Sequence, residues 1–128
     1  MVSHPKFYFF DTGVRRALDK TLTQELLPGT SEFGKIFEHF VIIEACRLND
    51  YFRKDYSFSY LRGRGDAEID LVIERPGLPE LLVEIKSSSR VDERDTKTVE
   101  TFLKDFKGAK GYCFSRDPIL KKIGSVEC

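Results

Sequence analysis

The chain has 128 residues, 41% of them hydrophobic, and its 21 basic side chains balance 21 acidic ones. A chain of this length buries about two-thirds of its unfolded surface, so we expect one domain over residues 1–128 that needs no disulfide or structural metal. Eleven Phe residues and 33% charged residues exclude a disordered tail, and no apolar run approaches the ~18 residues of a membrane span, so we expect a cytoplasmic protein.

The first predicted elements are a short strand, a short helix and a long helix. Lys6 to Asp11 (KFYFFD) has the pattern of a strand, and Thr12 to Leu18 that of one or two helical turns. From Ser31 to about Arg53 the chain contains no proline and is apolar around most of the helical circumference. With Thr30 or Ser31 as its N-cap, this stretch predicts a long helix that is buried on several sides.

The second half of the chain predicts strands on both sides of one helix. Strands are expected at 57–61, 67–74 and 80–86, and a turn at 75–79 separates the last two. Residues 92–106 have helical spacing, with Asp92 as cap and Gly108 as the stop. A core strand at 110–115 and a further edge at 121–128 complete the order, which is helix, three strands, helix, strand.

The informative stretch is DAEIDLVIERPGLPELLVEIKSSS, which predicts a hairpin with acidic side chains on both arms. Alternation places residues 69, 71 and 73 on one face of the first arm and residues 68, 70, 72 and 74 on the other. The second arm separates 81, 83 and 85 from 82, 84 and 86 in the same way. A turn about Gly77 would place Asp70 opposite Glu84 and Glu68 opposite Lys86.

Opposed carboxylates repel unless a proton or a cation lies between them, and hard oxygen ligands of this kind suit Mg²⁺ or Mn²⁺. Lys86, two residues after Glu84, adds a positive charge beside the pair. These groups would serve phosphodiester hydrolysis, with the ammonium orienting a water, accepting its proton or stabilising charge on phosphorus. The alternative is the solvated face of an antiparallel hairpin, where Glu and Lys are common.

Glu38 interrupts a mainly apolar stripe of the long predicted helix. Burial of an unpaired carboxylate costs several kcal/mol, so a partner is expected. Gly34, one turn earlier, leaves space for a close neighbour or a ligand. The alternative is a surface glutamate that pairs with His39 or Lys35.

The arrangement Gly34-x-x-x-Glu38, Glu68-Ile-Asp70 and Glu84-Ile-Lys86-Ser87-Ser88 resembles the PD-(D/E)XK phosphodiesterase superfamily. More narrowly, the runs FFDTGVRRAL, GKIFEHFVIIE, AEIDLVIE, VEIKSSS and AKGYCFS resemble a domain of unknown function found at the C-terminus of many prokaryotic AAA+ ATPases. That resemblance covers nearly the whole chain. In that family an ATPase module precedes this region, so we expect either part of a longer ATPase or a stand-alone copy.

The resemblance implies an α/β, restriction-endonuclease-like core with a central mixed sheet flanked by helices. It implies a catalytic set of Lys86, Asp70, Glu84 and Glu38, in which the three acids also hold Mg²⁺ or Mn²⁺. The family commonly has Asn after the helix glutamate, and this chain has His39 instead. The implied activity is metal-dependent cleavage of nucleic acid, most simply DNA.

Other charged residues around the hairpin are weaker candidates for contact with nucleic acid. The loop Arg62-Gly63-Arg64-Gly65 would bring guanidinium and amide groups to a phosphate, although such a loop is also a common tight connection. Ser87 and Arg90 follow the second arm and would line the same groove. Because the net charge is zero, any such binding must be local.

Two other hypotheses remain open. The domain would be catalytically silent if its long apolar helix served to dock onto an AAA+ ATPase or onto a second copy of the chain. The carboxylate cluster would be structural if Asp70 and Glu84 each paired with a basic side chain. Cys46, Cys113 and Cys128 have no CxxC spacing, and Cys46 and Cys113 lie in apolar segments typical of reduced core thiols.

Overall fold

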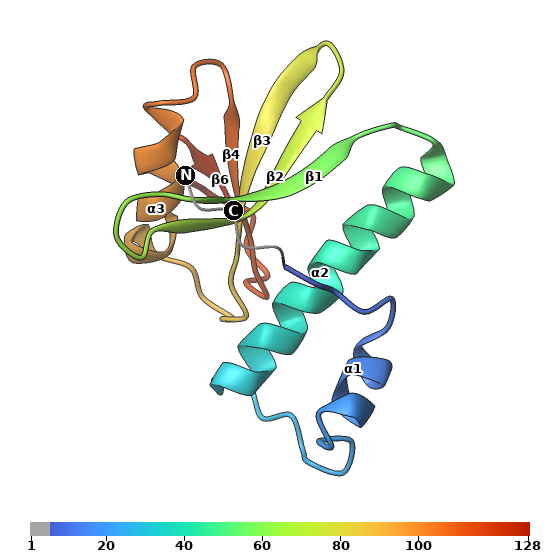
Figure 1. The fold of residues 1–128 in the computed structure, drawn as a ribbon. Coiled ribbons are helices and arrows are strands. Elements are labelled where there is room, and N and C mark those ends of the chain that lie inside the picture. Colours follow the sequence, from blue (N-terminus) through green and yellow to red (C-terminus); the bar gives the residue numbers. More distant parts are fainter. Residues whose placement is uncertain (1–5) are drawn as a thin grey trace.

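The computed structural model describes residues 6–128, and its sheet lies between helices (Figure 1). The elements within that range are α1 Thr12–Leu18, α2 Ser31–Phe52, β1 Ser57–Arg62, β2 Glu68–Arg75, β3 Leu78–Ile85, α3 Glu93–Leu103, β4 Lys110–Phe114, β5 Lys122–Ile123 and β6 Val126–Glu127. The predicted α/β class and the order of the main elements are confirmed.

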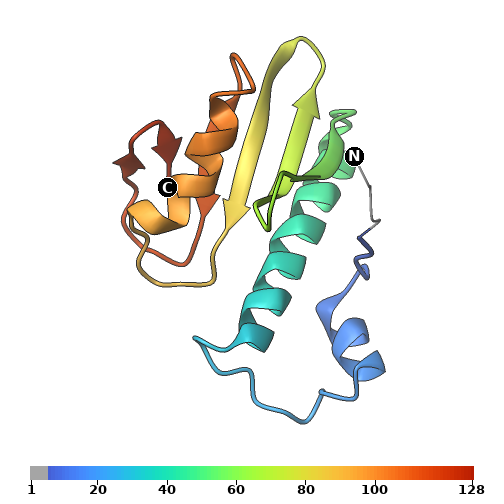
Figure 2. The same ribbon diagram turned by 60° about the vertical axis from the view of Figure 1, so that its left-hand side comes forward.

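The six strands form one mixed sheet in the order β1-β2-β3-β4-β6-β5. Strands β1, β2 and β3 are antiparallel neighbours, whereas β4 lies parallel to both β3 and β6. Helix α3 makes the crossover between the parallel strands β3 and β4, as such a connection requires. Figure 2 shows α3 and the long α2 on different sides of the sheet.

Each face of the sheet has its own hydrophobic cluster, because strand side chains alternate between the two faces. On the α3 side the buried residues are Ile69, Val72, Leu82, Val91, Val99, Cys113 and Val126. On the α2 side they are Ile42, Leu71, Val83 and Ile85. Strand β3 contributes to both clusters, which places it at the centre of the fold.

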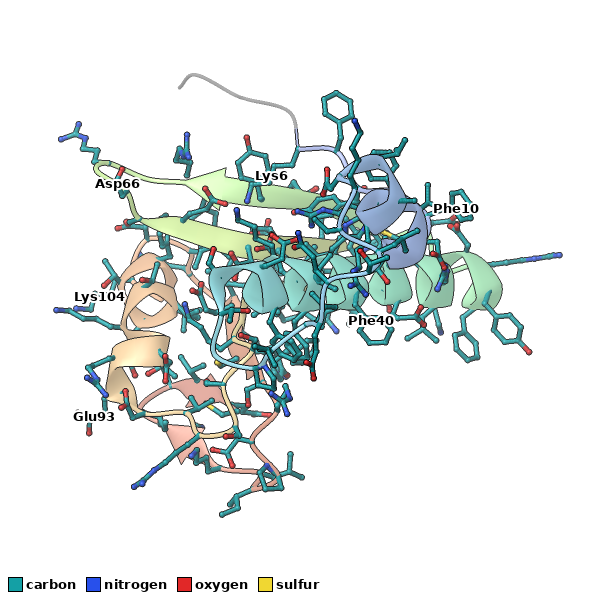
Figure 3. The ribbon with its side chains drawn as sticks, turned by 90° about the horizontal axis from the view of Figure 1, so that it is seen from below. Lys6, Phe10, Phe40, Asp66, Glu93 and Lys104 are labelled. Atoms are coloured by element: carbon teal, nitrogen blue, oxygen red, sulfur yellow. The ribbon has the colours of Figure 1, made fainter. Side chains whose placement is uncertain are left out.

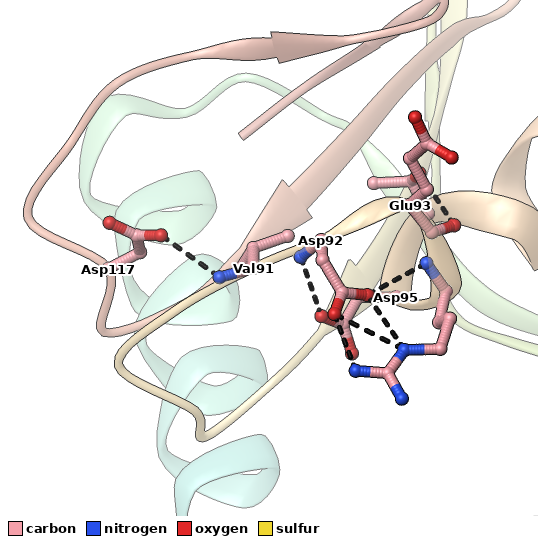
Figure 4. A network of polar contacts seen from close by, with 7 residues as sticks. Val91, Asp92, Glu93, Asp95 and Asp117 are labelled. Carbon is pink, nitrogen blue, oxygen red and sulfur yellow. Dashed lines mark hydrogen bonds and ion pairs between the residues drawn. The ribbon is translucent and has the colours of Figure 1, made fainter.

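The two longer helices begin where their caps predict. The Thr30 side chain accepts a hydrogen bond from the Phe33 amide at the start of α2. At α3, Asp92 and Asp95 form a reciprocal capping box (Figure 4). The Asp117 side chain accepts a hydrogen bond of 2.9 Å from the Val91 amide, and this bond fixes the loop that leads into α3. Helix α3 ends at Leu103, before the predicted Phe106.

The predicted strand at Lys6 to Asp11 is wrong. Residues 6–10 pair with no strand, and Asp11 is the N-cap of α1. The backbone carbonyls of Phe9 and Phe10 accept hydrogen bonds from side chains of α2 instead. Because helix side chains satisfy these groups, the segment needs no place in the sheet.

The predicted alternation on β2 is also wrong at one point. Ile69 packs on the α3 side with Val72, whereas Leu71 packs on the α2 side. The β1–β2 register shifts between Ser59, which faces Val72, and Leu61, which faces Ile69. Strand β2 therefore holds an extra residue here, and this bulge separates Ile69 from the face of Leu71.

The strand boundaries differ from the predictions by one or two residues. Strand β1 ends at Arg62 and not at 61, β2 covers 68–75 and not 67–74, and β4 ends at Phe114 and not at 115. Strand β3 begins at Leu78 and not at Glu80, because the turn is confined to Pro76 and Gly77, where Gly77 has φ +71°. The predicted edge at 121–128 is a hairpin of β5 and β6. None of the helices between residues 6 and 128 combines the length and the apolar character of a transmembrane segment.

Candidate active site

The predicted hairpin register is confirmed around the site. Leu71 pairs with Val83 and Val72 with Leu82, and the paired residues end there, one step before Asp70 and Glu84. Glu68 pairs with Arg62 of β1 and forms ion pairs with Lys6 and Arg62, and not with Lys86 as predicted. Asp70 lies in the bulged part of β2, and its Oδ2 accepts a hydrogen bond of 2.8 Å from the Ile85 amide. The Asp70 carboxylate is therefore aimed at the end of β3 that carries Glu84.

Glu84 is buried, with a relative exposure of 6%. Its Oε1 lies 2.6 Å from Lys86 Nζ. Its Oε2 is also buried and has no hydrogen-bond partner among residues 6–128. A buried carboxylate oxygen without a partner is costly, and such an atom in a native fold calls for a ligand or a function.

The Asp70 carboxyl has a strongly perturbed pKa, raised from its ordinary 3.8 to about 7. Burial is the largest cause, followed by the negative charge of Glu84 and, after the opposing hydrogen bond from Ile85, that of Glu38. Two carboxyl groups that crowd one another in this way favour either a proton or a cation between them. This mutual repulsion is what the sequence pattern predicted.

Glu84 and Lys86 form the charged pair beside Asp70. Burial raises the pKa of Glu84, although Lys86 opposes the change. Burial alone would lower the pKa of Lys86, but the hydrogen bond and charge of Glu84 outweigh it and raise this pKa. Lys86 is therefore held as an ammonium, which suits charge stabilisation better than proton acceptance.

The hypothesis that the carboxylate cluster is structural, with each acid paired to a basic side chain, is met only in part. Glu84 pairs with Lys86, as that alternative requires. Asp70, by contrast, forms no salt bridge with any side chain of residues 6–128, and its carboxylate accepts a hydrogen bond from the Ile85 amide. One of the two acids therefore remains without a basic neighbour in direct contact.

Glu38 approaches the strand acids from α2. Its Oε1 accepts a hydrogen bond of 3.0 Å from the Tyr8 hydroxyl, and not from His39 or Lys35 as the alternative proposed. Its charge contributes to the raised pKa values of both Asp70 and Glu84. The structure therefore brings the helix acid into the electrostatic range of the hairpin acids.

The sequence did not indicate that the segment before α1 belongs to this site. Lys6 forms an ion pair with Glu68 and lies 4.5 Å from the centre of the Tyr60 ring (Figure 3 labels Lys6). Burial, together with the charges of Glu38, Asp70 and Glu68, raises the pKa of Tyr8. The aromatic run suggested a strand, and nothing in its spacing showed that Tyr8 and Lys6 reach acidic side chains.

His39 of α2 binds the segment before α1 by a hydrogen bond to its backbone. It is 1% exposed, its Nε2 lies 2.6 Å from the Phe9 carbonyl oxygen, and its Nδ1 lies 3.3 Å from an Arg15 guanidinium nitrogen. A guanidinium only donates, so Nδ1 accepts, and Nε2 carries the proton that it donates to Phe9. The residue that departs from the family pattern thus has a structural role next to Glu38.

The residues predicted to contact nucleic acid lie at different positions around the site. Arg62 is exposed and lies 3.4 Å from Glu68. The Gly63 amide donates to the Ala67 carbonyl, so this loop is a tight connection that leaves Arg62 and Arg64 in solvent. Ser87 lies beside α2, where a Cβ on Gly34 would stand 3.6 Å from its Oγ. Arg90 is exposed.

The described residues fit a metal site of two carboxylates better than one of three. Across residues 6–128, no three His, Cys, Asp or Glu side chains stand in an arrangement that would hold an ion. Mg²⁺ commonly takes only one or two carboxylates and keeps several waters. Asp70 and the unpartnered Oε2 of Glu84 meet that requirement, and Glu38 as a direct ligand stays a prediction.

A separate cavity of about 620 Å³ lies between α3 and the β4–β6 edge, with Glu100, Lys104, Lys110 and Lys122 among its lining residues. It includes none of the predicted site residues. The features that indicate a functional site are therefore the crowded carboxylates and not this cavity.

Comparison with protein families gives a match over most of the chain. A family model described as "Domain of unknown function (DUF4143)" matches residues 33–125, which include most of α2, the hairpin and α3. No curated protein and no solved structure matches the chain.

Proposed function

The chain belongs to the DUF4143 family, whose description names no activity, and we propose that it is a divalent-metal-dependent phosphodiesterase of the PD-(D/E)XK type that cleaves DNA. The observation that carries the proposal is the unpartnered, buried Oε2 of Glu84 beside Asp70, whose pKa is raised to about 7. Neither feature is expected on a solvated hairpin face.

Asp70 and Glu84 would hold Mg²⁺ or Mn²⁺, which supplies polarisation of a phosphate oxygen and a more acidic water. Lys86, kept as an ammonium by Glu84, stabilises the negative charge that develops on the phosphoryl oxygens. Glu38, steadied by the Tyr8 hydroxyl, orients a water at the helix side of the site. Arg62 and Arg64 lie exposed on the adjoining loop, where they would contact a phosphate of the substrate strand.

Calorimetric titration of the full chain with Mn²⁺ tests the metal site. We expect binding to the parent and to Glu74→Gln, an exposed acid on the same strand, and little binding to Asp70→Asn. A DNA cleavage assay with Mg²⁺ then tests the chemistry, with Lys86→Ala expected to lose activity by at least about 100-fold. The proposal fails if the parent binds no Mn²⁺, or if Lys86→Ala cleaves as well as the parent.

A second candidate function rests on the face of α2 that points away from the sheet. Phe40, Leu48 and Tyr51 are 50%, 55% and 80% exposed, and at about 100° per residue they share one side of the helix. Figure 3 shows Phe40 on the side of α2 opposite to Phe10.

The occupant that fits this face is a second copy of the chain. In an antiparallel two-fold pair, Phe40 of one copy meets Tyr51 of the other, so the apolar pattern is self-complementary. Sedimentation tests this candidate. A dimer that Phe40→Glu or Tyr51→Glu breaks supports it, whereas a monomeric parent at high concentration removes it.

A further inference from the structure

Of the three free cysteines, Cys113 lies on β4 and Cys128 directly follows β6, the parallel neighbour of β4. Strand β4 pairs with β6 through Gly111–Val126 and Tyr112–Glu127. The next step of the same parallel register brings Cys113 opposite Cys128. Fifteen positions separate the two in the sequence, and nothing in that spacing indicated a pair.

Both thiols lie on the same face of the sheet. Cys113 is 1% exposed within the cluster on the α3 side, and Cys128 packs against that cluster. Cys128 shares its face with Val126, which is buried in the same cluster, because residues two apart on a strand point the same way. The Cys128 thiol donates a weak hydrogen bond of 3.9 Å to the Val126 carbonyl, which keeps the side chain over the end of β6.

The backbone of Cys128 is held in place by the β5–β6 hairpin. Its amide donates to the Lys121 carbonyl at 2.8 Å, and its carbonyl accepts from the Lys121 amide at 3.1 Å. Adjacent strands lie ~4.8 Å apart, which is inside the Cα separation that a disulfide spans. Cys46, on α2, packs in the cluster on the opposite face of the sheet.

We propose that Cys113 and Cys128 are a redox pair that closes to an intramolecular disulfide by exchange with a small-molecule disulfide such as oxidised glutathione. The half-exposed Cys128 attacks first, as its thiolate, and releases one glutathione thiolate, which takes up the proton lost from Cys128. Cys113 then loses its proton and attacks the Cys128 sulfur of the mixed disulfide, and a second glutathione thiol leaves. Two protein thiols are oxidised, and one glutathione disulfide is reduced to two thiols.

Burial makes this exchange slow. It raises the pKa of Cys113 to about 12, with the neighbouring Cys128 as the next cause, and burial also raises the pKa of Cys128. The thiolate is the attacking species, so reaction over hours is expected without a catalyst. The pair is therefore a slow sensor of a sustained oxidising shift.

The bond would form one strand away from the proposed active site. Cys113 pairs with Glu84 across β3 and β4, so Glu84, Cys113 and Cys128 lie in one row over three strands. The disulfide would link the end of β6 to β4, the strand that pairs with β3 at Glu84. The redox proposal does not depend on nuclease activity, since it needs only the two thiols.

Mass spectrometry of the full chain, incubated with oxidised and reduced glutathione, tests the proposal. We expect the loss of two hydrogen atoms and a tryptic link between residues 111–116 and 123–128. The melting temperature should rise by about 5–10 °C, because the bond closes a short loop. Cys46→Ser should behave like the parent, and Cys128→Ser should retain no link.

Three results would overturn the proposal. They are a stable glutathione adduct on Cys128 that Cys113 never displaces, a link that includes residues 36–47 with Cys46, or oxidation only between separate chains. Cys128→Ser changes a half-exposed side chain, so its folding is expected to survive and its result decides the matter even if Cys113→Ser unfolds.

Discussion

Asp70→Asn is expected to stabilise the metal-free protein at neutral and alkaline pH. The substitution keeps the shape of the side chain and its acceptor for the Ile85 amide, but it removes the charge that Glu84 and Glu38 repel. A residue proposed to bind a metal is thereby predicted to cost stability when no metal is bound, which is a trade-off typical of active sites.

The raised pKa of Asp70 sets the magnitude of this effect. The pKa is about 7 in the folded chain, against an ordinary value of 3.8. Each pH unit between the two values is worth about 1.4 kcal/mol, so the charged form costs up to about 4 kcal/mol. Because the pKa is raised, the stabilising contribution is present below pH 3.8 and is lost as the pH rises through about 7.

Urea unfolding at pH 5 and pH 8, in the presence of a chelator, measures the effect. The parent should lose about 2–3 kcal/mol between these two pH values, and the variant should be more stable by up to about 4 kcal/mol at pH 8. With an m-value of about 1–3 kcal/mol per M, the urea midpoint of the parent should fall by about 0.7–3 M between the two pH values. Both pH values lie well above the pKa of about 2 to which hydrogen bonds lower Asp117, so that group stays charged throughout.

The control is Asp66→Asn, which removes an exposed acid on the nearby loop (labelled in Figure 3) and should change stability little. The reasoning is refuted if the advantage of Asp70→Asn does not grow from pH 5 to pH 8. Addition of Mn²⁺ should reverse the order, with the parent gaining stability and the variant gaining little.

Three further substitutions test the architecture around the site by chemical denaturation. Gly34→Ala should stabilise the protein by about 0.5–1 kcal/mol, because its Cβ would meet Ser87 Oγ at an ordinary 3.6 Å and alanine favours the helix; a loss of stability would show that this approach is tighter. Thr30→Ala should cost about 1 kcal/mol by removing the α2 cap, and Thr30→Ser should restore most of it. Tyr8→Phe should cost about 1–3 kcal/mol, because Glu38 loses a half-buried hydroxyl donor, and no cost would mean that water replaces it.

Much of the fold was predictable because its signals are local. The boundaries of α2 follow from the Thr30 cap and a run without proline, and the hairpin register follows from Gly77 and two alternating arms. Residues 6–10 were misassigned because an aromatic run is strand-like wherever its hydrogen-bond partners lie. The carbonyls of Phe9 and Phe10 accept hydrogen bonds from side chains of α2 that lie about thirty positions away or more. A local sequence pattern does not predict partners at that distance.

The sequence alone determined which residue types meet on the hairpin, because alternation and turn chemistry act over a few neighbouring positions. Only the tertiary structure decided the rest. The β2 bulge aims Asp70 at Ile85, the Tyr8 hydroxyl binds Glu38, and the parallel pairing of β4 with β6 ends one residue before Cys113 and Cys128. Each of these depends on segments far apart in the chain, and their approach is set by the packing of both faces of the sheet at once.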